Sequence, residues 1–269
     1  MKKSILLIAL MMLSTVSFAQ TKVIAHRGYW KTEGSVQNSL ESLRKAGEIG
    51  CWGSEFDVWM TADGVCVIHH DGDLNGIRIE NIRYTDIRDS KLANGEKLPT
   101  LESYLWQGIH VAPTRLILEI KPLANKEKEK KCVDEVLRLV KKYGVANMTD
   151  YISFSMNVCE YLIVQAPKVL NGPNGQRSGE KVDKVNLRVE YLNGDVAPQD
   201  IKAKGLTGID YHSDVLMNKH PEWIEQCHDL GLEVNVWTVD NLEDVWTFIN
   251  KKVDKITTNR PLETIKLSK

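Results

Sequence analysis

The sequence has almost no net charge, few cysteines and no glycine-rich nucleotide motif, and each shortage excludes a class of protein. The formal net charge is −1 over 269 residues, which does not indicate nucleic acid or an anionic membrane surface as a partner. No Gly-x-Gly-x-x-Gly follows the first predicted strand, which disfavours a dinucleotide-binding sheet. The cysteines lack metal-ligand spacing, so we expect small buried side chains and leave one disulfide open: Cys51, Cys66, Cys132, Cys159 and Cys227.

The first apolar run is too short to cross a bilayer. Lys2 and Lys3 precede nine apolar residues, Ile5 to Leu13, and Ser17-Phe18-Ala19 fits a small-x-small cleavage site. The pattern predicts a signal peptide over residues 1–19 and one mature domain over 20–269, exported to the periplasm or outside the cell. A retained anchor is the alternative. No later segment has the pattern of a transmembrane helix, so no stable membrane insertion is expected.

Strand and helix patterns alternate along the rest of the chain. Eight short apolar segments are separated by helical segments, and they centre near residues 23, 55, 117, 152, 190, 209, 235 and 256. This alternation predicts an α/β fold, a (β/α)8 TIM barrel, with a doubly wound open sheet as the alternative. A return strand at 65–68 and the polar stretch 72–98 form a small insertion after the second strand. A second polar insertion, 171–184, has no assigned role.

Two of the predicted strands each carry a pair of charged residues spaced two apart. Glu55 and Asp57 are such a pair, and Glu119 and Lys121 repeat the spacing on another strand. Residues i and i+2 of a strand share a face, and the carboxyl ends of barrel strands meet at one mouth. Three carboxylates from two strands predict a site for a hard cation, Mg²⁺ or Ca²⁺. The alternative is an exposed edge strand with solvated acids.

Histidines follow two of the predicted strands. His26 ends the first strand, and His69 and His70 follow the return strand, where they suit acid–base chemistry near neutral pH. The adjoining Asp71 favours His70 over His69, and the choice stays open. Trp237, at the end of a late strand, forms either a wall for the substrate or part of the core.

The motifs in this order resemble the glycerophosphodiester phosphodiesterase family. The resemblance covers essentially the whole mature chain, and the combination is specific although each piece alone is weak. It rests on His26-Arg27-Gly28, Gln37-Asn38-Ser39, Glu55-Phe56-Asp57, Thr61-Ala62-Asp63-Gly64, Val67-Ile68-His69-His70-Asp71, Leu118-Glu119-Ile120-Lys121, Trp237-Thr238-Val239-Asp240 and Thr258-Asn259-Arg260-Pro261.

The resemblance implies a metal-dependent TIM barrel that hydrolyses small glycerophosphodiesters to glycerol 3-phosphate and an alcohol. It implies His26 and His70 as general acid and base, whereas Trp237 is a candidate for the substrate site from its position alone. It further implies Mg²⁺ or Ca²⁺ on Glu55, Asp57 and Glu119, with Arg27 and Lys121 near the phosphate.

One departure from the family concerns Val36-Gln37-Asn38-Ser39, which stands where Pro-Glu-Asn-Thr is usual. An amide thus replaces an acid, which weakens any role of that side chain near a metal. Two other functions stay open: a phospholipase that cleaves intact lipid through a cyclic phosphate, and an inactive barrel that binds phosphate esters. The head group, the metal, the nucleophile (water or a substrate hydroxyl) and the oligomeric state are not predicted.

Overall fold

The computed structural model describes residues 20–171 and 185–269. The predicted signal peptide, and all but the first residue of the 171–184 insertion, lie outside the described residues. No described helix is both long enough and apolar enough to cross a membrane.

Eight parallel strands close into a barrel. In chain order they are β1 (Lys22–Ala25), β2 (Gly53–Met60), β6 (Arg115–Ile120), β7 (Thr149–Ser153), β8 (Val189–Tyr191), β9 (Gly208–His212), β10 (Glu233–Trp237) and β11 (Lys255–Thr258). β1 pairs with both β11 and β2, which closes the sheet. The predicted TIM barrel is confirmed, and the closure rules out the open sheet.

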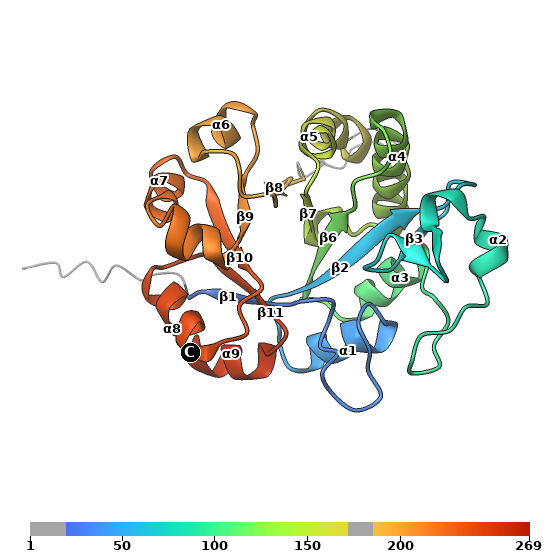
Figure 1. Cartoon of the computed structure of the whole chain (residues 1–269), viewed down its shortest axis with the longest axis horizontal. Coiled ribbons are helices and arrows are strands. Elements are labelled where there is room, and N and C mark those ends of the chain that lie inside the picture. The colour runs from blue at the N-terminus through green and yellow to red at the C-terminus, as the bar shows by residue number, and fades with distance from the viewer. Residues whose placement is uncertain (1–19, 172–184) are drawn as a thin grey trace, which may run out of the picture.

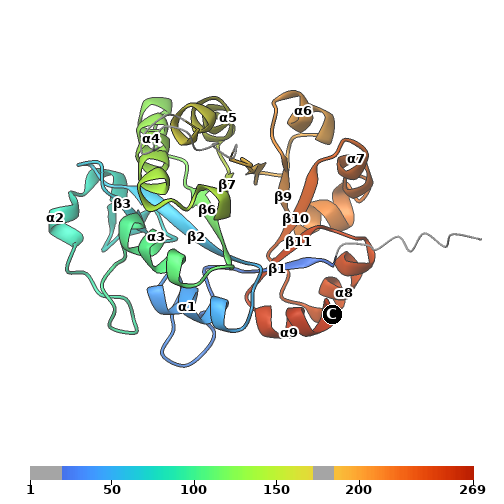
Figure 2. The ribbon, with the colours of Figure 1, turned by 180° about the vertical axis from the view of Figure 1, so that it is seen from behind.

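Helices surround the strands, as Figures 1 and 2 show from opposite sides. Side-chain caps begin several of them: Ser39 and Thr100 each accept a backbone N–H of the first turn. The longer helices are α1 (Leu40–Glu48), α3 (Leu101–His110), α4 (Lys126–Tyr143), α5 (Met156–Leu170), α6 (Pro198–Ala203), α7 (Trp223–Asp229), α8 (Leu242–Asn250) and α9 (Pro261–Leu267).

The alternation of side chains along β2 positions the site. Phe56 and Val58 are fully buried in the layer between strands and helices, where Phe56 meets the ring of Tyr104 on α3 at 4.3 Å. Glu55 and Asp57 therefore face the barrel interior. A small apolar cluster also lies in the interior, and two of its members, Ile152 and Leu192, line the same cavity as the acids: Ile24, Ile117, Ile152 and Leu192.

The insertion after β2 is anchored more firmly than its polar sequence suggests. It starts with β3 (Cys66–Ile68), antiparallel to β2, and continues through β4 (Asp73–Leu74), β5 (Ile77–Arg78), a 3₁₀ turn (Ile79–Asn81) and α2 (Tyr84–Ile87). Four apolar side chains of the insertion are buried: Ile79, Ile82, Ile87 and Leu98. The Glu96 carboxylate accepts hydrogen bonds from the backbone of Leu40 and Glu41, which ties the insertion to the start of α1.

Several details differ from the sequence-based expectations. α5 continues past Pro167 to Leu170, although a proline usually ends or kinks a helix, and the Pro167 carbonyl accepts the amide of Asn171. A π-helical turn at Val215–Lys219 was not predicted. The expected burial of the cysteines is confirmed, and all five are free thiols.

Candidate active site

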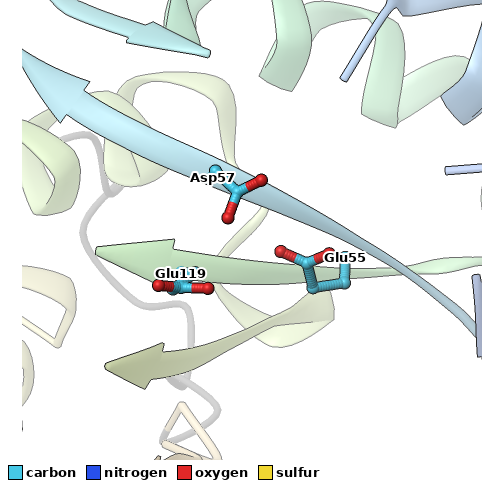
Figure 3. A group of neighbouring side chains, drawn as sticks. All are labelled: Glu55, Asp57 and Glu119. Atoms are coloured by element: carbon cyan, nitrogen blue, oxygen red, sulfur yellow. The ribbon is translucent and has the colours of Figure 1, made fainter. Parts of the chain in front are cut away.

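Three carboxylates converge at the mouth of the barrel. Asp57 on β2 lies directly beside Glu119 on β6, and Glu55 lies two residues before Asp57 on the same face. One oxygen from each side chain lies within 4.8 Å of the others, and all three residues are buried. Figure 3 shows the three carboxylates facing a common space beside the two strands. The predicted acidic cluster thus forms from two separate places in the chain.

Lys121 lies among these carboxylates. Its Nζ is 2.6 Å from Asp57 Oδ1 and 2.7 Å from Glu119 Oε1, and the residue is only 7% exposed. Although burial opposes its charge, the carboxylates of Glu119 and Asp57 raise the pKa of Lys121. Burial opposes the charge of Asp57 as well, but Lys121 and the amide of Asn38 lower its pKa. Lys121 therefore neutralises part of the cluster.

Glu55 is the least compensated of the three acids. Its Oε2 accepts the Arg27 backbone N–H at 2.8 Å, but its buried Oε1 has no hydrogen-bond partner among the described residues. Burial and the charges of Asp57 and Glu119 raise the pKa of Glu55 well above its ordinary value. An unpaired carboxylate oxygen beside two further acids suits a divalent cation with oxygen ligands, so these residues fit Mg²⁺ or Ca²⁺.

A hydrogen-bond chain orients His26. Asn259 Oδ1 accepts the indole N–H of Trp30 at 3.0 Å, and Asn259 Nδ2 donates to Asp240 at 2.9 Å. Because Trp30 can only donate, Asn259 Oδ1 is an acceptor, and His26 Nδ1, 3.0 Å away, carries the proton. The unprotonated Nε2 then faces the acidic cluster, 4.0 Å from Glu55 Oε2.

Burial, together with the charge of Arg27, lowers the pKa of His26 to about 4. The ring is therefore neutral at pH 7. A buried, neutral imidazole with its free nitrogen toward the site can accept a proton there.

His70 lies closer to solvent, with a side chain that is 40% exposed. Its Nδ1 is 2.8 Å from the Asp71 carboxylate. Burial lowers the pKa of His70, while the charge of Asp57 opposes that shift. His69 does not line the cavity that holds the acidic cluster, and its Nδ1 lies within hydrogen-bond distance, 2.9 Å, of the backbone carbonyl of Asp71.

The loop after β1 needs its glycine. Arg27 has a φ of 56° and Gly28 a φ of 78°. A Cβ at position 28 would lie 2.3 Å from the Ser42 hydroxyl oxygen. This tight passage lets the Arg27 amide reach Glu55 and turns the guanidinium toward Gln37, whose Oε1 accepts from it at 2.6 Å. Gln37 thus pairs with Arg27 rather than with the acids.

The site has two adjoining cavities. The inner one, about 150 Å³, is lined by all eight residues that the sequence analysis selected: His26, Arg27, Glu55, Asp57, His70, Glu119, Lys121 and Trp237. Asp210 also lines it, whereas His212 is exposed, packs edge-on against Trp237 and accepts the backbone N–H of Asp214 through Nδ1. An outer cavity of about 530 Å³ shares Arg27 and His70 with the inner one and includes His69.

Sequence reasoning missed the supporting roles of Asn38 and Asn259. Asn38 donates to the Asp57 carboxylate at 2.8 Å, and Asn259 holds His26. Both residues lie inside the motifs quoted above, which was the available signal. Their partners lie 19 and 233 positions away in the sequence, so no local pattern identifies them.

The chain is similar to known proteins in sequence and in fold. The chain matches the Glycerophosphoryl diester phosphodiesterase family over residues 26–263. It is 44% identical to a solved glycerophosphodiester phosphodiesterase from Parabacteroides distasonis, with a TM-score of 0.84, covering 93% of this chain and 97% of that one. It is 26% identical to a glycerophosphodiester phosphodiesterase from Caldanaerobacter subterraneus subsp. tengcongensis, over 92% of this chain and 98% of that protein.

A more distant structure shares the fold. A phosphodiesterase from Oleispira antarctica, solved in complex with the product sn-glycerol-3-phosphate, is 19% identical with a TM-score of 0.72, covering 92% of this chain and 96% of that one. The family match spans nearly the whole described barrel, including the acidic cluster and both histidines. The chain therefore belongs to the glycerophosphoryl diester phosphodiesterase family and is a phosphodiester hydrolase.

Proposed function

We propose that this chain hydrolyses glycerophosphodiesters to glycerol 3-phosphate and an alcohol, with His26 as general base and His70 as general acid. The observation that carries the proposal is the convergence of three buried carboxylates, a lysine and two imidazoles on one small cavity. The Oleispira antarctica neighbour, solved with sn-glycerol-3-phosphate, supports a substrate of this kind.

Glu55, Asp57 and Glu119 would hold the divalent cation, Mg²⁺ or Ca²⁺. When bound, it supplies Lewis-acid stabilisation of the charge that develops on the phosphate oxygens. Lys121 and Arg27 add positive charge in the same cavity and orient the phosphodiester.

The two histidines differ in burial and in hydrogen-bond partner, which supports a different role for each. His26 is buried and neutral, with its free Nε2 toward the acidic cluster, so it takes the proton of the attacking hydroxyl, from water or from the substrate's glycerol. His70 lines both cavities and is supported by Asp71, so it donates a proton to the departing alkoxide on the outer side. The phosphorus–oxygen bond to the alcohol breaks as the bond to the attacking oxygen forms. His26 gains one proton and His70 gives up one, so His70 has to be protonated when the reaction begins.

A soluble substrate fits the surface better than an intact lipid. Among the described residues, the exposed large apolar side chains lie on five different elements, two of them on α3, and none of them lines either cavity: Ile77, Trp106, Ile109, Val164, Trp246 and Leu267. A lipase working on a bilayer would need such residues gathered at the mouth.

The test compares glycerophosphocholine with an intact phospholipid as substrate, with Mg²⁺ and with EDTA. We expect metal-dependent hydrolysis of glycerophosphocholine, and losses of about 10²–10⁴-fold in kcat for His26→Ala and His70→Ala. His110→Ala, on the exposed end of α3, is the matched control and should retain full activity. Turnover of the intact lipid alone would favour the phospholipase. Metal-dependent binding without hydrolysis would favour the inactive barrel.

We also propose that the chain is exported. The basic and apolar pattern of residues 2–13 and the small residues before position 20 support a cleaved signal peptide. Amino-terminal sequencing of the protein from fractionated cells should find Gln20 as the first residue, in the periplasm or the medium. A cytoplasmic protein that starts at Met1 would contradict the proposal.

A further inference from the structure

Apart from Arg27 and His70, the residues that line the outer cavity have no role in the chemistry described above. Its volume, about 530 Å³, is more than three times the 150 Å³ of the inner one. Three stretches of the chain line it: residues 27–38, residues 68–71 at the end of β3, and the insertion at Leu92 and Ala93. The Asn94 side chain donates to the Gly34 carbonyl at 3.2 Å and joins the first stretch to the third. The cavity is therefore a built part of the fold.

The position of the outer cavity suits the alcohol that leaves. This step rests on the proposed function. The inner cavity holds the acidic cluster and His26 and is walled by Phe154 and Trp237, so its small volume suits the glycerol phosphate that all such substrates share. His70 and Arg27 line both cavities, so an alcohol bonded to a phosphate beside them would extend into the outer space. His70 then lies where the departing oxygen needs its proton.

The walls of the outer cavity are suited to hydroxyl groups. Lys31, Ser35, Gln37 and His69 bring hydrogen-bonding groups to it. Gln37 binds Arg27 through its Oε1, which leaves its amide N–H groups for a ligand. Such side chains form specific hydrogen bonds with a polyol, and the cavity is large enough to hold one.

The same walls are poorly suited to a positively charged head group. Trp30 is the aromatic side chain among the described residues that line the cavity, and Lys31 Nζ lies 5.2 Å from its ring centre. A quaternary ammonium group favours several free aromatic faces. Here it would instead meet the ammonium of Lys31 and the guanidinium of Arg27, each of which lies 3.8 Å from its nearest carboxylate partner, Asp240 and Asp57 respectively. Asp71 is the acidic residue in the lining, and its carboxylate lies 2.8 Å from His70 Nδ1.

We propose that the outer cavity binds the leaving alcohol and selects an uncharged, hydroxyl-rich alcohol, of the inositol or glycerol type, over a quaternary ammonium alcohol.

The first test measures kcat/KM with Mg²⁺ for glycerophosphoinositol, glycerophosphocholine and the small glycerophosphoethanol. We expect glycerophosphoinositol to exceed glycerophosphocholine by about tenfold or more, the value of one or two well-formed hydrogen bonds. An equal or higher value for glycerophosphocholine overturns the proposed selectivity. Hydrolysis of none of the three would overturn the proposed function, and this inference with it.

The second test narrows the cavity. Ala93 is exposed on the insertion, and Ala93→Trp should lower kcat/KM for glycerophosphoinositol about tenfold more than for glycerophosphoethanol, mainly through KM. Ser35→Trp narrows the cavity from the stretch of residues 27–38 and should act in the same direction. Ala203→Trp, exposed at the end of α6, is the matched control and should change neither value. Equal effects of the cavity variants on both substrates would overturn the assignment.

Discussion

Lys121→Met removes the ammonium group that lies between two carboxylates of the acidic cluster. In the metal-free protein, Lys121 Nζ is 2.6 Å from Asp57 and 2.7 Å from Glu119, and all three side chains are buried. Methionine has a similar length and fills the space, so the main change is the loss of charge. The two carboxylates, together with Glu55, then remain buried without their nearest cation.

Removing one partner from a buried ion pair costs about 3–5 kcal/mol, because the remaining charge stays desolvated. For a domain of this size, 1 kcal/mol corresponds to about 2–4 °C in Tm, so we expect Tm to fall by about 6–20 °C in EDTA. A divalent cation on the same carboxylates replaces the lost charge. At a concentration about 100 times its Kd it adds about 2.7 kcal/mol, so Mg²⁺ should restore much of the loss.

The assay is thermal unfolding followed by circular dichroism, in EDTA and in saturating MgCl₂. Lys204→Met is the matched control, because the Lys204–Glu160 pair is exposed and such pairs contribute little to stability. If Lys121→Met lowers Tm in EDTA no more than Lys204→Met does, Lys121 does not compensate the acids. If Mg²⁺ leaves the difference unchanged, the carboxylates are not the cation site.

Three further predictions follow from neighbouring features. Asn259→Leu removes the acceptor that orients His26 and should lower kcat about 10–100-fold with little change in KM. Asn259→Gln, which keeps both the acceptor for His26 and the donor to Asp240, should retain more of the rate, and equal rates for both variants would contradict the hydrogen-bond role. Glu55 has a pKa raised above 4.5, so the metal-free folded protein holds a proton that the unfolded chain releases, and stability falls as pH rises above 4.5. Glu55→Gln should flatten this fall and raise Tm in EDTA at pH 8; an unchanged pH profile would refute it. Gly28→Ala should lower the free energy of unfolding, measured in urea, by about 1–3 kcal/mol or more. Gly64→Ala is the control and should lower it less: both glycines have a positive φ, but of the two only a Cβ at position 28 would meet another described atom within 4 Å.

The strands could be predicted because their apolar periodicity is local. Eight barrel strands were expected, and the eight parallel strands of the barrel form near the same positions, because a buried parallel strand needs a nearly continuous apolar run. Helix ends were less predictable: the Pro167 region of α5 depends on which carbonyls still find a donor, which the sequence pattern does not show. The polar composition of the insertion likewise does not indicate that Ile79 and Leu98 are buried against the barrel.

The sequence by itself determined the barrel and the face on which Glu55, Asp57 and Glu119 lie. The two-residue period of a strand and the shared mouth of parallel strands require that placement, whatever the rest of the chain does. Only the tertiary structure decided which of His69 and His70 faces the inner cavity, because both follow the end of β3, where no pleat sets their direction.

The tertiary structure likewise decided that Asn259 orients His26 and that the insertion meets the loop of residues 30–38 to form the outer cavity. Those contacts join residues far apart in the sequence, and their geometry follows from barrel closure and loop packing rather than from any local pattern.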